Sequence, residues 1–482
     1  MRIERHPILD FDRRHSFTFS YYGEPVTAYP GESIAAALHA SGVKVLSRSV
    51  IHERPRGFFC GIGKCSSCLM RVDGIPSVRT CIVPAAEGMT VEPTQRQLPE
   101  ASFASHTPVD IDIEVLVIGA GPAGMSAAIE AAQHGSQVLI LDENPRMGGQ
   151  LIKQTHKFFG SKEEQAGTRG ITIARELEEQ ITALAENNHV DMLLQTAAFG
   201  YYGRVNNAHV IAAANQMDNQ LYCITAQQVI IATGAMENML AFPGNDLPGV
   251  YGAGGVQTLM NVYGIKPGER VLMVGAGNVG LIVSYQLLQA GVAVDRVVEA
   301  LPHIGGYHVH AAKLRRHGVS IYTRHSIREV YGNEAVEGAI VVELDDDWNE
   351  VPGSQEDVPC DTVCLAVGLT PSARLLFQAD VEQRYIPAAG GHVAVHNDHM
   401  ETSIPGLYTT GDASGIEEAS TAMVEGKIAG LAAATALHEV TDADMMLQEY
   451  RDRLADMRVG PFGQKPREAK QIIRKEADHA GL

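Results

Sequence analysis

Four cysteines have the spacing of ligands to an iron–sulfur centre. Cys60, Cys65, Cys68 and Cys81 read C-x4-C-x2-C-x12-C, and this spacing is typical of plant-type 2Fe–2S sites. Three of them must lie on one loop, and two glycines within it permit the left-handed backbone that such a loop needs. Two alternatives are four unrelated thiols and a zinc site, because C-x2-C also suits zinc. Zinc loops rarely carry the leading C-x4 arm, so the spacing favours a cluster that transfers single electrons.

A glycine-rich loop after a buried strand predicts a dinucleotide site. Gly119, Gly121 and Gly124 follow a continuous apolar run as G-x-G-x-x-G, and such a run is expected of a strand in a parallel sheet. Gly119 allows the tight turn, Gly121 lets the backbone approach a pyrophosphate, and Gly124 lets helix and strand pack closely. The helix N-terminus would hold the phosphates. The next strand ends in Asp142 and Glu143, and we expect Asp142 to accept the ribose hydroxyls.

A second strand and glycine loop follow downstream, which suggests one domain inserted within another. Gly275, Gly277 and Gly280 again form G-x-G-x-x-G, and the next strand ends in Glu299. No arginine follows that acid until Arg315, so a 2′-phosphate has no obvious partner and NAD is favoured over NADP. The alternative is that this loop keeps the fold of a nucleotide site without binding a pyridine nucleotide.

The remaining cysteines predict no disulfide chemistry. No C-x2-C pair lies near Gly149 or in the second glycine-loop region, which argues against a disulfide reductase. Cys360 and Cys364 belong to an apolar strand and read as buried small hydrophobes, as does Cys223. We find no Ser-His-Asp array or paired carboxylates for hydrolysis, so the sequence names no catalytic residue.

Length, composition and charge limit the classes of protein to which the chain can belong. The 482 residues suggest about three domains, and 45% apolar and 20% charged residues are ordinary for a globular chain. A net charge of −19 argues against nucleic acid or an anionic membrane as partner. We find neither an 18-residue apolar run nor a signal-peptide core, so we expect no membrane insertion. Seven cysteines, four of them in one motif, suit a reducing compartment, and we expect a cytoplasmic protein.

These motifs predict an α/β chain of five segments. The first, 1–100, reads as a small β-grasp unit, with strands at 16–22, 24–29, 69–72, 79–83 and 89–92 and a helix at 33–41. A polar, proline-containing stretch at 95–110 reads as a linker. The first dinucleotide domain covers 112–250 and returns at 371–440, with the inserted NAD-binding-like domain at 251–370. Residues 441–482 form a charged tail that we expect to be helical.

The β-grasp unit with its cysteine loop resembles the 2Fe–2S ferredoxin superfamily. Three later segments resemble two-dinucleotide-binding flavoproteins: 147–150 (MGGQ), 231–234 (IATG) and 405–412 (PGLYTTGD). The resemblance implies FAD in the first site, with Asp412 on the ribityl chain. The residues assigned to nucleotide binding are Gly119, Gly121, Pro122, Ala123, Gly124, Asp142, Glu143, Gly149, Gln150, Thr233, Gly234, Gly411 and Asp412 in the first site, and Gly275, Gly277, Gly280 and Glu299 in the second.

The whole chain resembles the α subunits of heteromeric amine dehydrogenases. This group includes sarcosine oxidase, opine oxidase, hydroxyproline and proline dehydrogenases, and hydrogen cyanide synthase. The segments that carry the resemblance are 54–57 (RPRG), before the cluster cysteines, and 242–250 (FPGNDLPGV), after the IATG strand. The resemblance implies that a β subunit of the D-amino-acid-oxidase-like type, with its own FAD, oxidises a secondary amine. This chain would then pass the electrons on, with an FMN possible at the interface between the two chains.

Two other functions stay open. In one, the chain is a self-sufficient reductase in which NADH reduces FAD and FAD reduces the cluster. In the other, it is a structural subunit whose first site holds a nucleotide such as NAD or ATP. The sequence does not name the substrate or the electron acceptor, because that chemistry would lie on other polypeptides.

Overall fold

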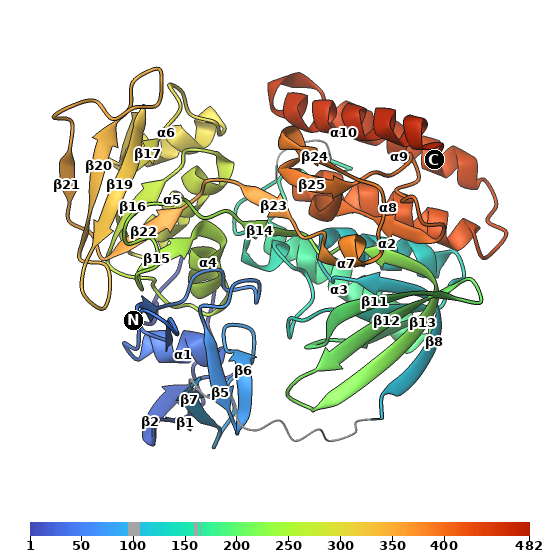
Figure 1. Cartoon of the computed structure of the whole chain (residues 1–482), viewed down its shortest axis with the longest axis horizontal. Helices are drawn as coiled ribbons and strands as arrows, with labels where there is room; N and C mark the ends of the chain where they lie inside the picture. Colours follow the sequence, from blue (N-terminus) through green and yellow to red (C-terminus); the bar gives the residue numbers. More distant parts are fainter. Residues whose placement is uncertain (95–106, 159–161, 164) are drawn as a thin grey trace. The chain divides into compact units, whose positions relative to one another are not determined.

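The computed structural model describes residues 1–94, 107–158, 162–163 and 165–482. The chain forms two compact units, one of Met1–Ser102 with Glu237–Gly368 and one of Phe103–Met236 with Leu369–Leu482. Figure 1 shows the helices and strands, most of them labelled. Most of the predicted linker, 95–106, falls outside the described residues. Within the described ranges, no helix has the length and apolar character needed to cross a bilayer.

The N-terminal part of the first unit is built on a five-stranded sheet. Its order is β2-β1-β7-β5-β6, with β1 and β7 parallel and the other pairs antiparallel. Helix α1 covers the sheet with a fully buried surface, and Ser33 caps its N-terminus by accepting the Ala36 N–H at 3.2 Å. The elements are β1 (Phe17–Tyr21), β2 (Glu24–Ala28), α1 (Ile34–Ala40), β3 (Ser47–Arg48), β4 (Pro55–Arg56), β5 (Leu69–Val72), β6 (Ile75–Arg79) and β7 (Thr90–Pro93).

The predicted strand at 79–83 is wrong, because the strand β6 ends at Arg79. The next residues bond to neighbours outside the sheet instead. The N–H and hydroxyl of Thr80 both donate to the Cys68 carbonyl, at 3.3 and 2.7 Å. The Thr80 carbonyl accepts the Ala35 N–H of α1 at 3.0 Å. This turn holds Cys81 beside the loop that carries the other three cysteines.

The inserted part of the first unit is a second α/β fold. Its sheet has the order β15-β22-β16-β17-β18 with every pair parallel, and β19-β20-β21 form a separate antiparallel sheet. Its elements are β15 (Val250–Gly252), α4 (Ala253–Gln257), the π-helix η2 (Thr258–Val262), β16 (Arg270–Val274), α5 (Asn278–Gln289), β17 (Ala293–Glu299), α6 (His308–Arg316), β18 (Ser320–Thr323), β19 (His325–Tyr331), β20 (Gly338–Glu343), β21 (Glu356–Val358) and β22 (Thr362–Leu365).

The second unit has a seven-stranded sheet. Its order is β10-β9-β8-β13-β12-β11, with β26 also paired to β13. The first part of this unit and β26 comprise β8 (Val109–Ile118), α2 (Pro122–Gln133), β9 (Val138–Leu141), η1 (Leu151–Lys153), α3 (Gly170–Glu186), β10 (Val190–Leu193), β11 (Ala197–Val205), β12 (Ala208–Asn215), β13 (Gln220–Ile231), β14 (Ala235–Glu237, which ends in the first unit) and β26 (Leu407–Thr409).

The return segment brings a long helix onto α2. On α8 (Ala419–Thr435), a Cβ added at Gly426 would lie 2.2 Å from the Ala123 carbonyl oxygen, and one at Gly430 would lie 2.3 Å from that of Ala127. These two glycines therefore let α8 lie directly on the helix that follows the first glycine loop. The return segment also contains β23 (Leu369–Pro371), α7 (Arg374–Gln378), β24 (Gln383–Ile386), η3 (Pro387–Ala389), β25 (Gly391–Ala394) and η4 (Gly411–Ser414).

The chain ends in two helices, α9 (Ala443–Met457) and α10 (Gly460–Ala480). Ala469 and Ile473 of α10 pack in a small apolar cluster with Ile386, Ala389 and Val393, and Figure 1 shows α10 running past β24 and β25. The C-terminal helices are therefore part of the second unit and not a free extension.

Candidate redox site

Four thiols gather at the cluster loop. Cys60, Cys68 and Cys81 are buried and Cys65 is half-buried. Hydrogen bonds from Cys65 and Cys81 lower the pKa of the Cys60 thiol to about 2, and one from Cys81 lowers the pKa of Cys68. Among the described residues, no three His, Cys, Asp or Glu side chains converge on a single metal ion. The thiols instead contact one another in a chain, and an all-thiol donor set with three of its four members buried fits a two-iron cluster.

The backbone of the loop is bent to suit this arrangement. Gly61 and Gly63 have φ of +64° and +74°, a region that side chains rarely adopt. A Cβ at Gly63 would also lie 2.8 Å from the Ile82 side chain. The Cys65 N–H donates to the Cys60 sulfur at 3.5 Å. Backbone donors aimed at sulfur stabilise a thiolate and would tune a bound cluster.

The cluster loop lies on the inserted domain within the first unit. The Phe59 carbonyl accepts the Gly252 N–H at 3.2 Å, and a Cβ at Gly255 would lie only 2.0 Å from that same oxygen. The Tyr263 hydroxyl, just after η2, donates to the Cys81 carbonyl at 3.3 Å. Phe59 and Cys60 also belong to the apolar core of the inserted domain. The two parts of this unit are therefore packed together at the cluster.

An ion-pair cluster closes the edge of this contact. Arg54 and Arg56, from the RPRG segment, both pair with the carboxylate of Asp246, the Arg56 contact being 2.9 Å. Asp246 belongs to the 242–250 segment. The two sequence segments that carry the family resemblance therefore meet in the structure.

The first glycine loop has the shape of a dinucleotide site. Gly119 has φ of +110°, and a Cβ there would lie 2.3 Å from the Ala232 oxygen. A Cβ at Gly124 would lie 1.8 Å from the Gly119 oxygen, whereas one at Gly121 would meet nothing within 4 Å. The Asp142 carboxylate accepts the Ala120 N–H at 2.7 Å. The loop is thus in close contact with neighbouring backbone at Gly119 and Gly124, whereas the space beside Gly121 is free and a pyrophosphate would fit there.

Other predicted residues lie around this loop. Gly149 approaches it closely, because a Cβ there would lie 2.8 Å from the Gly121 Cα. A Cβ at Gly411 would lie 2.7 Å from the Ala123 Cβ, so the late flavin segment lies against the first loop. The Thr233 hydroxyl is used by the fold, donating to the Ser372 carbonyl at 2.6 Å. The side chain of Gln150 is exposed and Glu143 is half-buried.

The second glycine loop repeats the first nearly atom for atom. Gly275 has φ of +106° and would place a Cβ 2.3 Å from the Ala366 oxygen. A Cβ at Gly280 would lie 2.0 Å from the Gly275 oxygen, and one at Gly277 would meet nothing within 4 Å. The Glu299 carboxylate accepts the Ala276 N–H at 2.7 Å, as Asp142 does for Ala120. The two glycine loops therefore share the same local geometry.

A glycine pair at this second site is not among the residues predicted from the sequence. Gly305 and Gly306 donate their N–H groups to the Ala276 carbonyl at 3.2 and 3.0 Å, and Gly148 does the same to Ala120 at 2.8 Å. In each domain the pair begins six residues after the ribose acid. This repeated spacing would have allowed Gly305 and Gly306 to be predicted from the sequence.

Comparison with known families decides the class. Residues 113–426, more than half of the chain, match the family described as "Pyridine nucleotide-disulphide oxidoreductase". The chain belongs to this family. Residues 14–96 match the "2Fe-2S iron-sulfur cluster binding domain". The predicted fold class, an α/β flavoprotein with two Rossmann-like domains preceded by a cluster domain, is confirmed. The cofactors of this oxidoreductase are FAD and a 2Fe–2S cluster, while the individual nucleotide-binding residues stay predictions.

Several curated proteins resemble this oxidoreductase over much of its length. The alpha subunit of sarcosine oxidase from Corynebacterium sp. (strain P-1) is 27% identical over 462 residues, covering 90% of this chain and 45% of that protein. An opine oxidase subunit from Agrobacterium tumefaciens (strain Ach5) is 28% identical over 336 residues, covering 66% of this chain and 65% of that protein. The chain thus spans less than half the length of the sarcosine oxidase protein.

A solved structure shares the fold. The L-proline dehydrogenase from P. horikoshii superposes with a TM-score of 0.69 and 22% identity, covering 93% of this chain and 79% of that one. The thioredoxin reductase of T. acidophilum superposes with a TM-score of 0.54 and 22% identity, over 67% of this chain and 98% of that one. At this identity the likeness concerns the fold alone.

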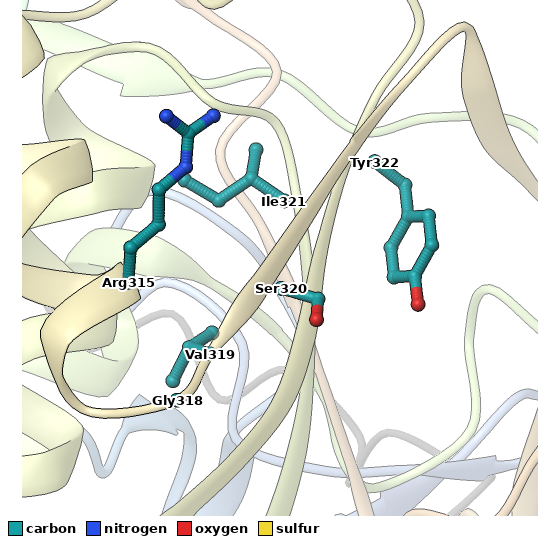
Figure 2. Close-up of a pocket in the computed structure, with 6 residues that line it drawn as sticks. All are labelled: Arg315, Gly318, Val319, Ser320, Ile321 and Tyr322. Atoms are coloured by element: carbon teal, nitrogen blue, oxygen red, sulfur yellow. The ribbon is translucent and has the colours of Figure 1, made fainter.

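One pocket of this oxidoreductase lies away from these residues. It has a volume of about 400 Å³ and is found where α6 ends and β18 begins. Figure 2 shows the side chains of Arg315 and Tyr322 on either side of the β18 ribbon. The residues that line it are Arg315, Gly318, Val319, Ser320, Ile321 and Tyr322. None of them belongs to a glycine loop or to the cluster loop, so we assign this pocket no role.

Asp412, the predicted ribityl partner, holds a proton unusually tightly. Its side chain keeps some accessible surface, yet its pKa is raised to about 7, mainly by burial and also by the nearby carboxylates of Glu417 and Glu425. Lys470 and the Glu417 N–H act in the opposite direction. An aspartate in an unfolded chain titrates near 4. The unfolded chain therefore loses this proton first, and the stability of the flavin-free protein should fall as pH rises from about 4 to about 7.

Asp412→Asn is expected to remove that pH dependence. Between pH 5 and pH 8, the free energy of unfolding of the wild type should fall by about 2 to 3 kcal/mol more than that of the variant, because the amide does not titrate. Urea unfolding of the flavin-free chain at the two pH values measures the difference. If the two proteins lose stability in parallel, Asp412 does not carry the raised pKa.

Proposed function

We propose that this chain is the electron-transferring α subunit of a heteromeric flavin-dependent dehydrogenase. Its substrate would be a secondary amine or N-substituted amino acid of the sarcosine, opine or hydroxyproline type. The observation that carries the proposal is the similarity, over 90% of the chain, to the alpha subunit of a sarcosine oxidase. The similarity to an opine oxidase subunit supports it, as does the cluster domain that precedes the oxidoreductase domains.

The amine would be oxidised on a partner. We propose a β subunit of the D-amino-acid-oxidase-like type with its own FAD, and an FMN at the interface is compatible with the proposal. In this chain, Gly121 and the α2 N-terminus would hold the FAD pyrophosphate, Asp142 the ribose and Asp412 the ribityl chain. Cys60, Cys65, Cys68 and Cys81 would hold the cluster. A flavin takes a hydride and can release single electrons, and a 2Fe–2S centre takes one at a time.

In the first unit, the cluster loop packs against the inserted domain. The Phe59 carbonyl and the Gly252 N–H join the cluster loop to the inserted domain, and Tyr263 holds the carbonyl of Cys81. These contacts orient the loop and exclude water from its Cys60 side.

Disulfide chemistry is not part of the proposal, because the single C-x2-C pair of the sequence, Cys65 and Cys68, belongs to the cluster motif. The same cysteine usage supports a cytoplasmic location for the chain.

A self-sufficient NADH-dependent reductase is the second candidate. One observation favours it: the Gly277 loop has the same open geometry as the Gly121 loop, and Glu299 bonds to it as Asp142 does. A third function, in which the chain holds a nucleotide without redox chemistry, would be revealed by the nucleotide that the protein releases.

The chain purified alone under anaerobic conditions separates these functions. Its cofactors are extracted and identified by mass, and NADH is then added while the spectrum is recorded. We expect FAD and iron, with both centres staying oxidised, because the electrons should arrive from the missing partner. Flavin bleaching followed by cluster reduction would instead establish the NADH-dependent reductase. Release of NAD or ATP without flavin would establish the nucleotide-holding function.

A further inference from the structure

A group of buried charges lies behind the late flavin segment. Glu425, on α8, is 2% exposed and Glu417 is 5% exposed. Arg458, between α9 and α10, reaches both: its guanidinium is 2.6 Å from a Glu425 oxygen and 2.7 Å from a Glu417 oxygen. The Lys470 ammonium of α10 lies 2.8 Å from the same Glu425 oxygen. The C-terminal helices thus supply two cations to a buried pair of carboxylates.

The two cations keep Glu425 ionised. Burial alone would raise the pKa of this carboxyl, but the attraction of Lys470 and Arg458 outweighs it and lowers the pKa to about 2. A buried charge that loses its partner is strongly destabilising. Here the buried Glu425 carboxylate has two cationic partners. The position of Glu425 is therefore set by the C-terminal helices.

Glu425 in turn fixes the backbone of the flavin segment. Its second oxygen accepts the Gly411 N–H at 3.1 Å and the Ser414 hydroxyl at 2.9 Å. Lys470 donates to the Ser414 hydroxyl at 2.7 Å and to the Ser414 carbonyl at 3.1 Å. These bonds hold both ends of the short helix η4, which carries Asp412. The same segment rests on Ala123 of the first glycine loop.

The two cations lie outside the part of the chain that matches the family. That match ends at residue 426, so it includes Glu417 and Glu425 but neither Arg458 nor Lys470. The helix α10 is anchored separately by Ile473 in an apolar cluster. Apolar packing thus places the helix, and the buried cations add contacts that packing alone would not require.

We propose that Lys470 and Arg458 are positioning residues for the flavin. They hold Glu425 in the place from which it fixes Gly411 and Ser414, so that the C-terminal helices set both the affinity for FAD and its redox potential. This inference rests on the proposed function in that the first glycine loop holds FAD.

Lys470→Met in the full chain tests the inference. The flavin-stripped variant should bind FAD about tenfold more weakly, because Glu425 is left with one cation and η4 loses two hydrogen bonds. Flavin still bound should have a lower midpoint potential, since a positive charge that favours the reduced form is gone. Lys470→Arg should restore both. The matched control is Lys475→Met, an exposed lysine on the same helix, which should leave both unchanged.

The outcomes separate this inference from the proposed function. If wild type carries no flavin, the proposed function and this inference both fail. If wild type carries FAD and Lys470→Met binds it with unchanged affinity and potential, this inference alone fails. Should Lys470→Met not fold, Lys470→Met combined with Glu425→Gln also removes the buried carboxylate that has lost one of its two cations. Normal FAD affinity in a folded double variant would overturn the inference, and weakened affinity would support it.

Discussion

Replacing Cys65 with serine is expected to abolish the visible sulfur-to-iron absorption bands of the purified chain, or to change them strongly. Four thiols are in contact at the loop, and Cys65 donates its N–H to the Cys60 sulfur at 3.5 Å. Without it three thiolates remain for two irons, one short of the usual set. Cys65 is also the least buried of the four, so serine can replace it without an internal cavity. Absorption spectra and iron content per chain measure the effect.

Cys223→Ser is the matched control for this experiment. Cys223 is half-buried on β13 in the other unit, so its loss should leave the iron content and the spectrum as in the wild type. A Cys65→Ser protein with an unchanged spectrum would refute the assignment of the cluster.

Gly121→Ala is expected to leave the protein folded while weakening FAD binding by about 10- to 100-fold. A Cβ at this position meets nothing within 4 Å in the flavin-free protein, and φ of −79° suits any residue. The added methyl group would lie where the pyrophosphate must approach the backbone. Flavin content after purification and an FAD titration measure the loss. Circular dichroism should show an unchanged fold.

Gly277→Ala provides the control within the same chain. Its surroundings are equally open and its φ is −73°, so it makes the same change in the second site. This variant should keep its FAD. Loss of FAD from Gly277→Ala with normal FAD in Gly121→Ala would reverse the assignment of the two sites.

The sequence predicted the parts of the site that depend on local spacing. The four cysteines and both glycine loops are recognisable because their geometry follows from neighbours along the chain. The strand expected at 79–83 was wrong because a distant partner decides it: Thr80 bonds to Cys68 and to α1 instead of continuing the sheet. The pattern of apolar residues carries no information about that choice.

Long-range contacts explain what else could not be predicted. Glu425 and Lys470 are ordinary charged residues in the sequence, and their burial together depends on how α10 packs against the return segment. Gly255 reads as one of many glycines until the Phe59 carbonyl is found beside it. Gly305 and Gly306 differ, because a comparison of the two glycine loops by spacing alone would have revealed them.

The packing of Phe59 and Cys60 into the inserted domain has a consequence for how the protein is made. Ribosomes add about 5–20 residues per second, so roughly 15 to 60 seconds should pass between synthesis of the cluster loop and emergence of Gly368, the end of its partner domain. During that interval the Cys60 side of the loop is uncovered. We therefore expect the cluster loop to be most accessible to iron and sulfide while the chain is still being made.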